Sequence, residues 1–302
     1  MGSAERLLFV GGLRDAFRKQ YWSAARISRE LSELVPMIRG RTSVSRWAIL
    51  NIQEQRSSQT LLVDQLQNSE VPVFPEVPDG FDGILYIDDA TFTGRTLARY
   101  LELIHQQVSR LKSGPKELVI WHVCEYSSDA LGLLGPKVSM LRNLGVNVHF
   151  HPVEIFQRRD HLGRAHSALI PKRSHAEIPI VQRYLKSATT LKKIAKSELL
   201  WRERETLSDD PIFESPERRD VVERAFLEIG CWLRLRTQSW NQLMRPFGFV
   251  ANTSVESLGF GSMFCTYLNS SNTSPIALWW GDPRAENSAL SNWDPLLPRR
   301  AQ

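Results

Sequence analysis

Residues 83–96, GILYIDDATFTGRT, constrain the fold of this chain more than any other stretch. A short apolar run, 84–87, stops at two acids, Asp88 and Asp89, and a loop rich in hydroxyl groups follows. A helical pattern then begins at Leu97. A buried strand, an acidic turn, a loop and a helix, in this order, are typical of an open parallel sheet. In such sheets, ligands bind beyond the carboxyl ends of the strands.

The loop after the two acids has the composition of a phosphate site. Its candidate binding residues are Thr91, Thr93, Gly94, Arg95 and Thr96. The first turn of a helix offers unpaired backbone N–H groups and the positive end of the helix dipole to an anion. The two acids can accept hydrogen bonds from sugar hydroxyl groups, or hold Mg²⁺ together with those groups. The pattern therefore predicts a site for a sugar phosphate.

The acidic loop lies within a repeating strand–helix pattern. Four apolar or alternating runs predict strands: 47–52, 84–87, 118–124 and 146–153. Helical patterns follow the first three of them, so strand and helix alternate three times. We therefore expect an α/β fold with a mostly parallel sheet and flanking helices. Ahead of the sheet, residues 5–35 predict one amphipathic helix that ends at Pro36.

The chain of 302 residues is 42% hydrophobic and 24% charged, which is enough for a sizeable packed core. We expect an α/β core in residues 1–155, a helical basic region in 156–250, and strands and a tail in 251–302 that complete the core. In the last part, two apolar runs at 262–268 and 276–280 flank a turn-rich stretch and predict a hairpin-like pair of strands.

A second polar loop follows the first predicted strand. Arg56, Ser57 and Ser58 lie between that strand and a helical pattern, so they form a candidate second anion site. A serine at this position can equally be an ordinary N-cap that accepts a hydrogen bond from the first turn of the helix. The spacing alone leaves both interpretations open.

The run DDATFTGRT resembles the signature loop of type I phosphoribosyltransferases, in which a hydrophobic strand and two acids precede a small, threonine-rich loop. The resemblance implies that Asp88 and Asp89 are the catalytic acids and face the ribose hydroxyls of phosphoribosyl pyrophosphate. It also implies that residues 91–96 hold the 5-phosphate, that Mg²⁺ bridges pyrophosphate and ribose, and that residues 54–58 form the pyrophosphate loop. Phe92 departs from the pattern, which has a small residue there. A nucleobase hood is not recognisable, which argues against routine nucleotide salvage.

A narrower resemblance covers most of the chain. Together with the acidic loop, the late block GFGSMFCTYLNSSNTSPIALWW resembles the PRTase-CE effector family of bacterial conflict systems, through Gly259, Gly261, Asn269, Asn272, Pro275 and Trp279. This resemblance implies a toxin-like or sensor role in anti-phage defence, including retron-associated systems. It also implies a restraining partner, either a protein or an RNA–protein complex such as a retron reverse transcriptase. An enzyme acting at an anomeric carbon and a non-catalytic, nucleotide-sensing or partner-binding module both remain open.

The basic segment, the histidines, the cysteines and the hydropathy of the chain give weaker indications of function than the acidic loop. The segment from Arg158 to His175 is rich in Arg and His, and is either a solvated face or a contact for nucleic acid. His149 and His151 share a strand face but lack a third ligand, so no metal site is predicted from histidines. The three cysteines predict reduced thiols in a cytoplasmic protein. No apolar stretch is long enough to cross a bilayer, and the N-terminus lacks a signal pattern.

Overall fold

A computed structural model describes residues 2–40, 46–53, 57–66, 69–156, 168–190, 201–202, 210–237, 241–250, 257–281, 291 and 293–297. The chain divides into two compact units. We call Trp22–Phe156 the sheet unit, and Met1–Tyr21 together with Gln157–Gln302 the helical unit.

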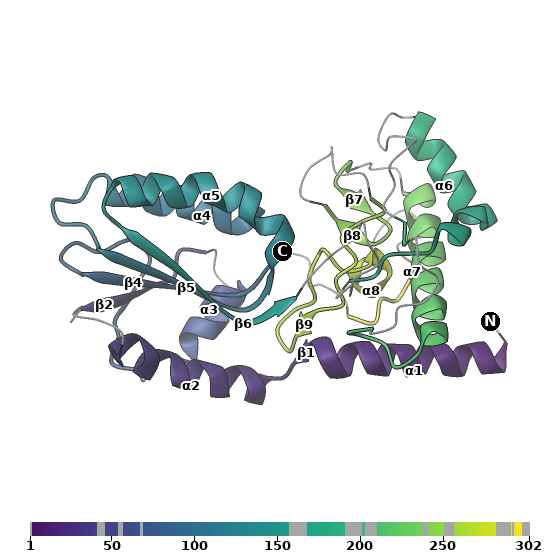
Figure 1. Cartoon of the computed structure of the whole chain (residues 1–302), viewed down its shortest axis with the longest axis horizontal. Helices are drawn as coiled ribbons and strands as arrows, with labels where there is room; N and C mark the ends of the chain where they lie inside the picture. Colours follow the sequence, from purple (N-terminus) through teal and green to yellow (C-terminus); the bar gives the residue numbers. More distant parts are fainter. Residues whose placement is uncertain are drawn as a thin grey trace. The chain divides into compact units, whose positions relative to one another are not determined.

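The sheet unit is a five-stranded parallel sheet with helices on both faces (Figure 1). The strand order is β3-β2-β4-β5-β6, and each neighbouring pair is parallel. The elements are α2 (Ala24–Gly40), β2 (Trp47–Leu50), α3 (Ser58–Asp64), β3 (Val73–Phe74), β4 (Gly83–Thr91), α4 (Arg95–Val108), β5 (Glu117–Tyr126), α5 (Ser127–Asn143) and β6 (Asn147–Phe156). The expected α/β fold with a mostly parallel sheet is therefore confirmed.

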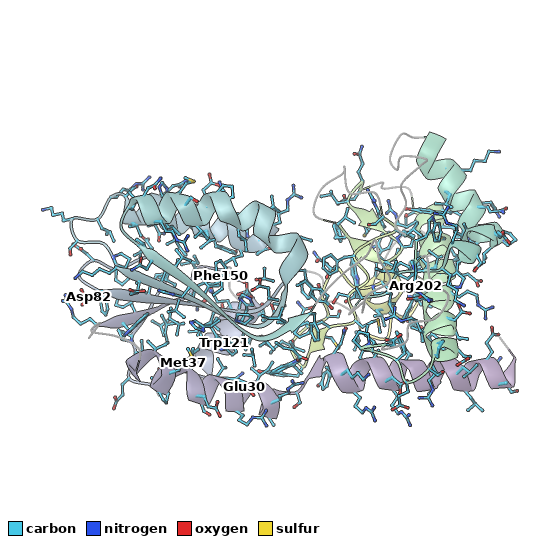
Figure 2. All side chains as sticks on the ribbon, viewed as in Figure 1. Glu30, Met37, Asp82, Trp121, Phe150 and Arg202 are labelled. Atoms are coloured by element: carbon cyan, nitrogen blue, oxygen red, sulfur yellow. The ribbon has the colours of Figure 1, made fainter. Side chains whose placement is uncertain are left out.

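Every second residue of the central strands points to the face of the sheet on which α4 and α5 pack, and these residues form an apolar core with the two helices. Ile84 and Tyr86 of β4 are fully buried in one cluster with Leu101 and other apolar residues of these two helices. Burying each such side chain contributes about 1.5–3 kcal/mol. In Figure 2, Phe150 lies on the side of the sheet that α5 covers, and Trp121 lies on the side of α2. Both faces are thus covered, which is why the strands are nearly continuous apolar runs.

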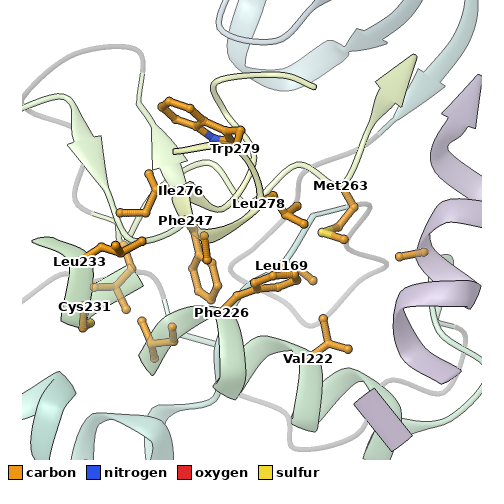
Figure 3. Close-up of a cluster of buried hydrophobic side chains, with 14 of the residues drawn as sticks. Leu169, Val222, Phe226, Cys231, Leu233, Phe247, Met263, Ile276, Leu278 and Trp279 are labelled. Carbon is orange, nitrogen blue, oxygen red and sulfur yellow. The ribbon is translucent and has the colours of Figure 1, made fainter. Parts of the chain in front are cut away.

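The helical unit is built around a long helix, α7. Its elements are α1 (Ser3–Gln20), the 3₁₀ helix η1 (Arg173–Glu177), α6 (Pro179–Thr190), α7 (Pro216–Arg236), β7 (Met244–Arg245), β8 (Gly248–Phe249), β9 (Cys265–Thr266) and α8 (Ile276–Trp279); β1 (Tyr21–Trp22) spans the boundary. Ser215 caps α7 by accepting a hydrogen bond from the Arg218 N–H at 3.3 Å. In Figure 3, Phe226 of α7 lies beside Phe247 and Leu169 within a buried apolar cluster.

The predicted helix at residues 5–35 is two helices, α1 and α2, separated by an extended pair. Trp22 is buried, and its indole N–H donates to Glu154 at 3.2 Å. Ser23 then accepts a hydrogen bond from the Arg26 N–H at 3.3 Å, which is how a serine caps the start of a helix. At the other end, α2 continues through Pro36 to Gly40, because the apolar face that it buries includes Ile38.

The predicted C-terminal pair of strands is wrong in its second member. Residues Ile276–Trp279 form the helix α8, in which the Trp280 N–H donates to the Ile276 carbonyl at 2.8 Å. All four residues are buried, and a run this short has no periodicity that separates a strand from one helical turn. Pro275 is the N-cap of this helix, and its carbonyl accepts a hydrogen bond from the Leu278 N–H at 2.9 Å. The first member is only the two-residue strand β9.

The compact units also differ from the three expected domains. The first 21 residues belong to the helical unit and not to the α/β core. Residues of the late block, such as Met263 and Leu278, pack in the cluster around α7 and do not add strands to the five-stranded sheet.

Candidate functional site

The acidic loop lies at the carboxyl end of β4, in the middle of the parallel sheet. Asp88 and Asp89 are part of the strand, which continues to Thr91. Helix α4 begins at Arg95, so the connection is only Phe92, Thr93 and Gly94. This arrangement places two acids and a helix start at the edge of the sheet where ligands of such folds bind.

Gly94 allows the sharp turn from the strand into α4. Its φ is +72°, in the left-handed region that residues with a Cβ atom adopt at a cost. Gly94 is the N-cap of α4, and no side chain caps this helix. Its carbonyl accepts the first helical hydrogen bond, from the Ala98 N–H at 2.8 Å. The first-turn N–H groups of α4 are therefore available to an anion.

Asp88 is buried and is already saturated with hydrogen bonds inside the protein. One carboxylate oxygen accepts from Gln53 at 2.7 Å and from the Tyr86 hydroxyl at 3.1 Å. The other accepts from the Ser58 hydroxyl at 3.1 Å and from the Asp89 backbone N–H at 2.9 Å. Four donors fill the acceptor capacity of one carboxylate. Asp88 therefore holds the loop in place.

Asp89 has fewer donors than Asp88: the Ala90 N–H donates to its carboxylate at 2.8 Å, and the Ser58 hydroxyl, which donates to Asp88, lies close enough to lower the pKa of Asp89 as well. Burial, and then the neighbouring charge and hydrogen bond of Asp88, raise the pKa of Asp89 to about 8. Two adjacent carboxyl groups with little access to water share one proton more readily than they carry two charges. The sequence predicts the same role for the two acids. In the structure, the Asp89 carboxylate has fewer hydrogen-bond donors than that of Asp88, so it retains more capacity to accept hydrogen bonds from a ligand.

The raised pKa of Asp89 predicts a pH-dependent stability. Between the ordinary pKa of about 3.9 and the folded value of about 8, the folded chain holds a proton that the unfolded chain has lost. Rising pH therefore favours unfolding, by at most about 1.4 kcal/mol per pH unit for one group. We expect Asp89→Asn to become progressively more stable than the wild type from pH 5 to pH 8 in urea denaturation. A constant difference between the two proteins would contradict the assignment.

The remaining predicted loop residues divide by exposure. Thr91 and Gly94 are buried, Thr93 is half-buried, and Arg95 and Thr96 are exposed at the start of α4. Within the described residues, the side chains of the three threonines and Arg95 form no hydrogen bond or ion pair. The structure thus leaves these groups available, as a binding loop requires.

Phe92, the departure from the phosphoribosyltransferase pattern, packs in an aromatic row along the same edge of the sheet. Its ring lies 5.4 Å from that of Tyr126, which in turn lies 5.4 Å from Phe156. Such pairs contribute about 0.5–1.5 kcal/mol beyond the area they bury. The Phe92 ring therefore packs the loop against the aromatic residues at the ends of β5 and β6 and stabilises its position. The sequence marked Phe92 as unusual but did not indicate its partners.

The second polar loop has structural contacts of its own. Ser57 is the N-cap of α3 and accepts a hydrogen bond from the Thr60 N–H at 3.3 Å, as the alternative interpretation expected. Ser58 donates to Asp88 and so connects the two loops. Arg56, the third predicted residue, lies outside the described residues.

Three further polar residues at this edge were missed or given little weight in the sequence. Glu125, at the end of β5, lies 3.0 Å from the ring of the fully buried His122. Glu154 of β6 accepts from Trp22 and from Arg26, each at 3.2 Å. Spacing along the chain could not bring Glu125 and Glu154 to the same edge, because they lie on two different strands.

The histidines on β6 do not form a metal site with their neighbours. His149 lies 2.6 Å from Glu117, a single carboxylate partner. Among the residues that the structure describes, no three His, Cys, Asp or Glu side chains are arranged to hold a metal ion. Cys124, Cys231 and Cys265 are buried free thiols.

Only the end of the predicted basic segment is described. His175 and Lys172 both pair with Asp220, at 2.9 and 3.0 Å, so part of its positive charge is neutralised. Residues 157–167, which include His161 and His166, lie outside the described part. No helix within the described ranges has the length and hydropathy needed to cross a membrane.

The parallel sheet, the acidic strand end and the short loop into α4 define a phosphoribosyltransferase-like fold. The sequence model of the PRTase-CE family matches residues 11–299, and the chain therefore belongs to this family.

The solved structures to which the chain is similar include phosphoribosyltransferases. The xanthine-guanine-hypoxanthine enzyme of Helicobacter pylori is 13% identical, with a TM-score of 0.28, over 46% of this chain and 90% of that one. The adenine enzyme of Leishmania donovani is 10% identical, with a TM-score of 0.31, over 52% and 80%. Likenesses this distant carry no argument about activity. No curated protein matches the chain.

Proposed function

We propose that the protein binds a ribose phosphate or a nucleotide at residues 88–96 and acts at the anomeric carbon, as an effector of an anti-phage defence system. One observation carries the proposal: an uncapped helix start lies three residues beyond a strand end whose carboxylate, Asp89, is not saturated. The first-turn N–H groups of α4 suit the phosphate, and Asp89 suits the ribose hydroxyls. Thr93 and Thr96 add hydroxyl donors beside the phosphate.

Mg²⁺ fits this donor set. The ion commonly binds through one or two carboxylates and completes its shell with water and substrate phosphates. Asp89 would supply one carboxylate once it loses, on Mg²⁺ binding, the proton that its raised pKa retains, whereas the hydrogen bonds to Asp88 leave that carboxylate little capacity. Bound Mg²⁺ would stabilise negative charge on a pyrophosphate leaving group. The loop with Arg56, Ser57 and Ser58 is the proposed contact for that pyrophosphate.

The reaction that this geometry favours passes through an oxocarbenium-like state at the anomeric carbon. A fixed carboxylate near the ribose stabilises the developing positive charge. In a defence setting, the outcome would be nucleotide depletion or base removal in the cytoplasm. A restraining protein, or an RNA–protein complex such as a retron reverse transcriptase, would hold the effector inactive until infection.

A non-catalytic module is the second candidate, and the saturated state of Asp88 favours it. An acid that is fully bonded to its own chain stabilises a binding loop but takes no direct part in chemistry. In this case, residues 88–96 would bind a nucleotide as a signal and control the assembly with the partner.

Two measurements test the proposal. In calorimetry, phosphoribosyl pyrophosphate with Mg²⁺ should bind, and ribose without phosphate should not. In cells with the activated system, the double variant Asp88→Asn/Asp89→Asn should lose toxicity and leave the nucleotide pool, followed by mass spectrometry, unchanged. Full toxicity of the folded double variant would rule out the proposed site. Ligand binding with no nucleotide consumed by the activated wild type would favour the sensing module.

A further inference from the structure

Strand β5 contributes a carboxylate to each of two carboxylate–histidine pairs, one near each of its ends. At its amino end, Glu117 lies 2.6 Å from His149, whose side chain is 49% exposed. At its carboxyl end, Glu125 lies 3.0 Å from His122, whose side chain is 0% exposed. The two pairs share the same chemistry, but only the second is buried at the edge of the sheet that carries the acidic loop.

The hydrogen bonds of His122 indicate where its proton lies. Its Nδ1 atom has no hydrogen-bond partner among the described residues, and its Nε2 atom faces a Glu125 oxygen. A proton on Nε2 makes this contact a charge-assisted bond to a carboxylate. The imidazole therefore fixes one oxygen of Glu125 and orients the carboxylate.

A buried polar pair at this position is not needed for packing. The rest of the strand, Leu118 to Cys124, is apolar except for His122, and apolar residues there would pack without the cost of burying a charge. The position of this buried polar pair beside the proposed ligand site is therefore better explained by a function than by packing.

Glu125 also lies next to the proposed site. The register of β4 and β5 pairs it with Thr91, the residue at which the acidic strand ends. Burial, followed by the charges of Glu154, Asp89 and Glu125, raises the pKa of the Cys124 thiol. By the register of β4 and β5, Asp89 and Glu125 lie on adjacent strands at the same end of the sheet.

We infer that Glu125 is the general base of the reaction at the anomeric carbon and that His122 is its positioning residue. The inference rests on the proposed function. A water O–H bond breaks, the water oxygen bonds to the anomeric carbon, and its proton passes to a Glu125 oxygen. The bond to the leaving group breaks, and its electron pair departs with that group. When the leaving group is a nucleobase, the proton then passes from Glu125 to the departing nitrogen; when it is pyrophosphate, the proton passes to solvent water, and either transfer restores the carboxylate.

The test compares Glu125→Gln with Glu117→Gln, the matched change at the other end of β5. The activated full-length protein is given phosphoribosyl pyrophosphate with Mg²⁺, and separately the four ribonucleoside monophosphates. Loss of a general base costs about 10²–10⁴-fold in rate. We expect Glu125→Gln to lose at least about 100-fold in turnover while its dissociation constant for phosphoribosyl pyrophosphate stays within about threefold. Sodium azide, a nucleophile with no proton to lose, should restore product formation as the ribosyl azide. Glu117→Gln should match the wild type.

Three results would overturn the inference, and they are distinguishable. Wild-type turnover in Glu125→Gln would exclude the base and leave the proposed function intact. A wild-type protein that binds phosphoribosyl pyrophosphate without consuming any substrate would exclude the base and favour the sensing module. A wild-type protein that binds none of these ligands would reject the proposed function, and the base with it.

Discussion

Gly94→Val should abolish ligand binding at the acidic loop while the sheet unit stays folded. A β-branched residue is poorly tolerated at a φ of +72°, so the turn into α4 must change its path. The first-turn N–H groups then no longer converge on one point. Each hydrogen bond to a charged group contributes about 1.5–3 kcal/mol, so losing two of them weakens binding by at least about 100-fold. Calorimetry with phosphoribosyl pyrophosphate and Mg²⁺ measures the loss.

Gly145→Val is the matched control for this change. Gly145 follows α5, has a φ of +83°, and leaves open space for an added Cβ atom. Its backbone cost is therefore similar, but it precedes β6 at the opposite end of the parallel sheet from the acidic loop. Gly145→Val should lose stability and keep the wild-type affinity. Equal affinities in the two variants would show that the α4 start does not hold the ligand.

Glu223→Ala should destabilise the helical unit by about 3–5 kcal/mol, because it leaves two buried cations without their shared partner. Glu223 is 0% exposed and accepts from Arg219 at 2.7 Å and from Arg202 at 2.9 Å. It also accepts from the Ile170 N–H at 3.1 Å. Without the carboxylate, the two guanidinium groups and the Ile170 N–H each lose one hydrogen-bond acceptor inside the protein. Urea denaturation of the full chain measures the change.

Glu214→Ala is the control for Glu223→Ala. Glu214 also pairs with several arginines, among them Arg18 at 2.7 Å, but its side chain is 38% exposed. When an exposed carboxylate is removed, water can solvate the arginines that it paired with, so little stability is lost. The urea concentration at the unfolding midpoint of this variant should therefore be close to that of the wild type. If both variants lose the same stability, burial is not the reason that Glu223 matters.

The strand–loop–helix pattern around Asp88 was predictable because it is local. Apolar runs, acids and a glycine follow one another within 14 positions, and the alternation of strands and helices fixed the parallel sheet. The different roles of Asp88 and Asp89 were not predictable, because Gln53 and Ser58 reach Asp88 from another loop. The partners of Glu125 and Phe92 likewise depend on strand register, which no spacing in the sequence encodes.

Two of the local errors have related causes. The break before α2 depends on a buried indole hydrogen bond of Trp22, which outweighs a continuous helical pattern. Helix α8 forms from a four-residue apolar run that is too short to show a period. In both places, tertiary packing decided between conformations that the local sequence permits equally.

Amide chemical shifts test the central claim most directly. In a ¹⁵N-labelled sample of the full chain with Mg²⁺, ribose 5-phosphate is titrated and the backbone amides of Thr93, Gly94, Arg95 and Thr96 are followed. We expect these four amides to shift together and to saturate, and ribose without phosphate to leave them unmoved. Saturating shifts elsewhere in the chain, with these four amides unchanged, would contradict a phosphate site at the start of α4.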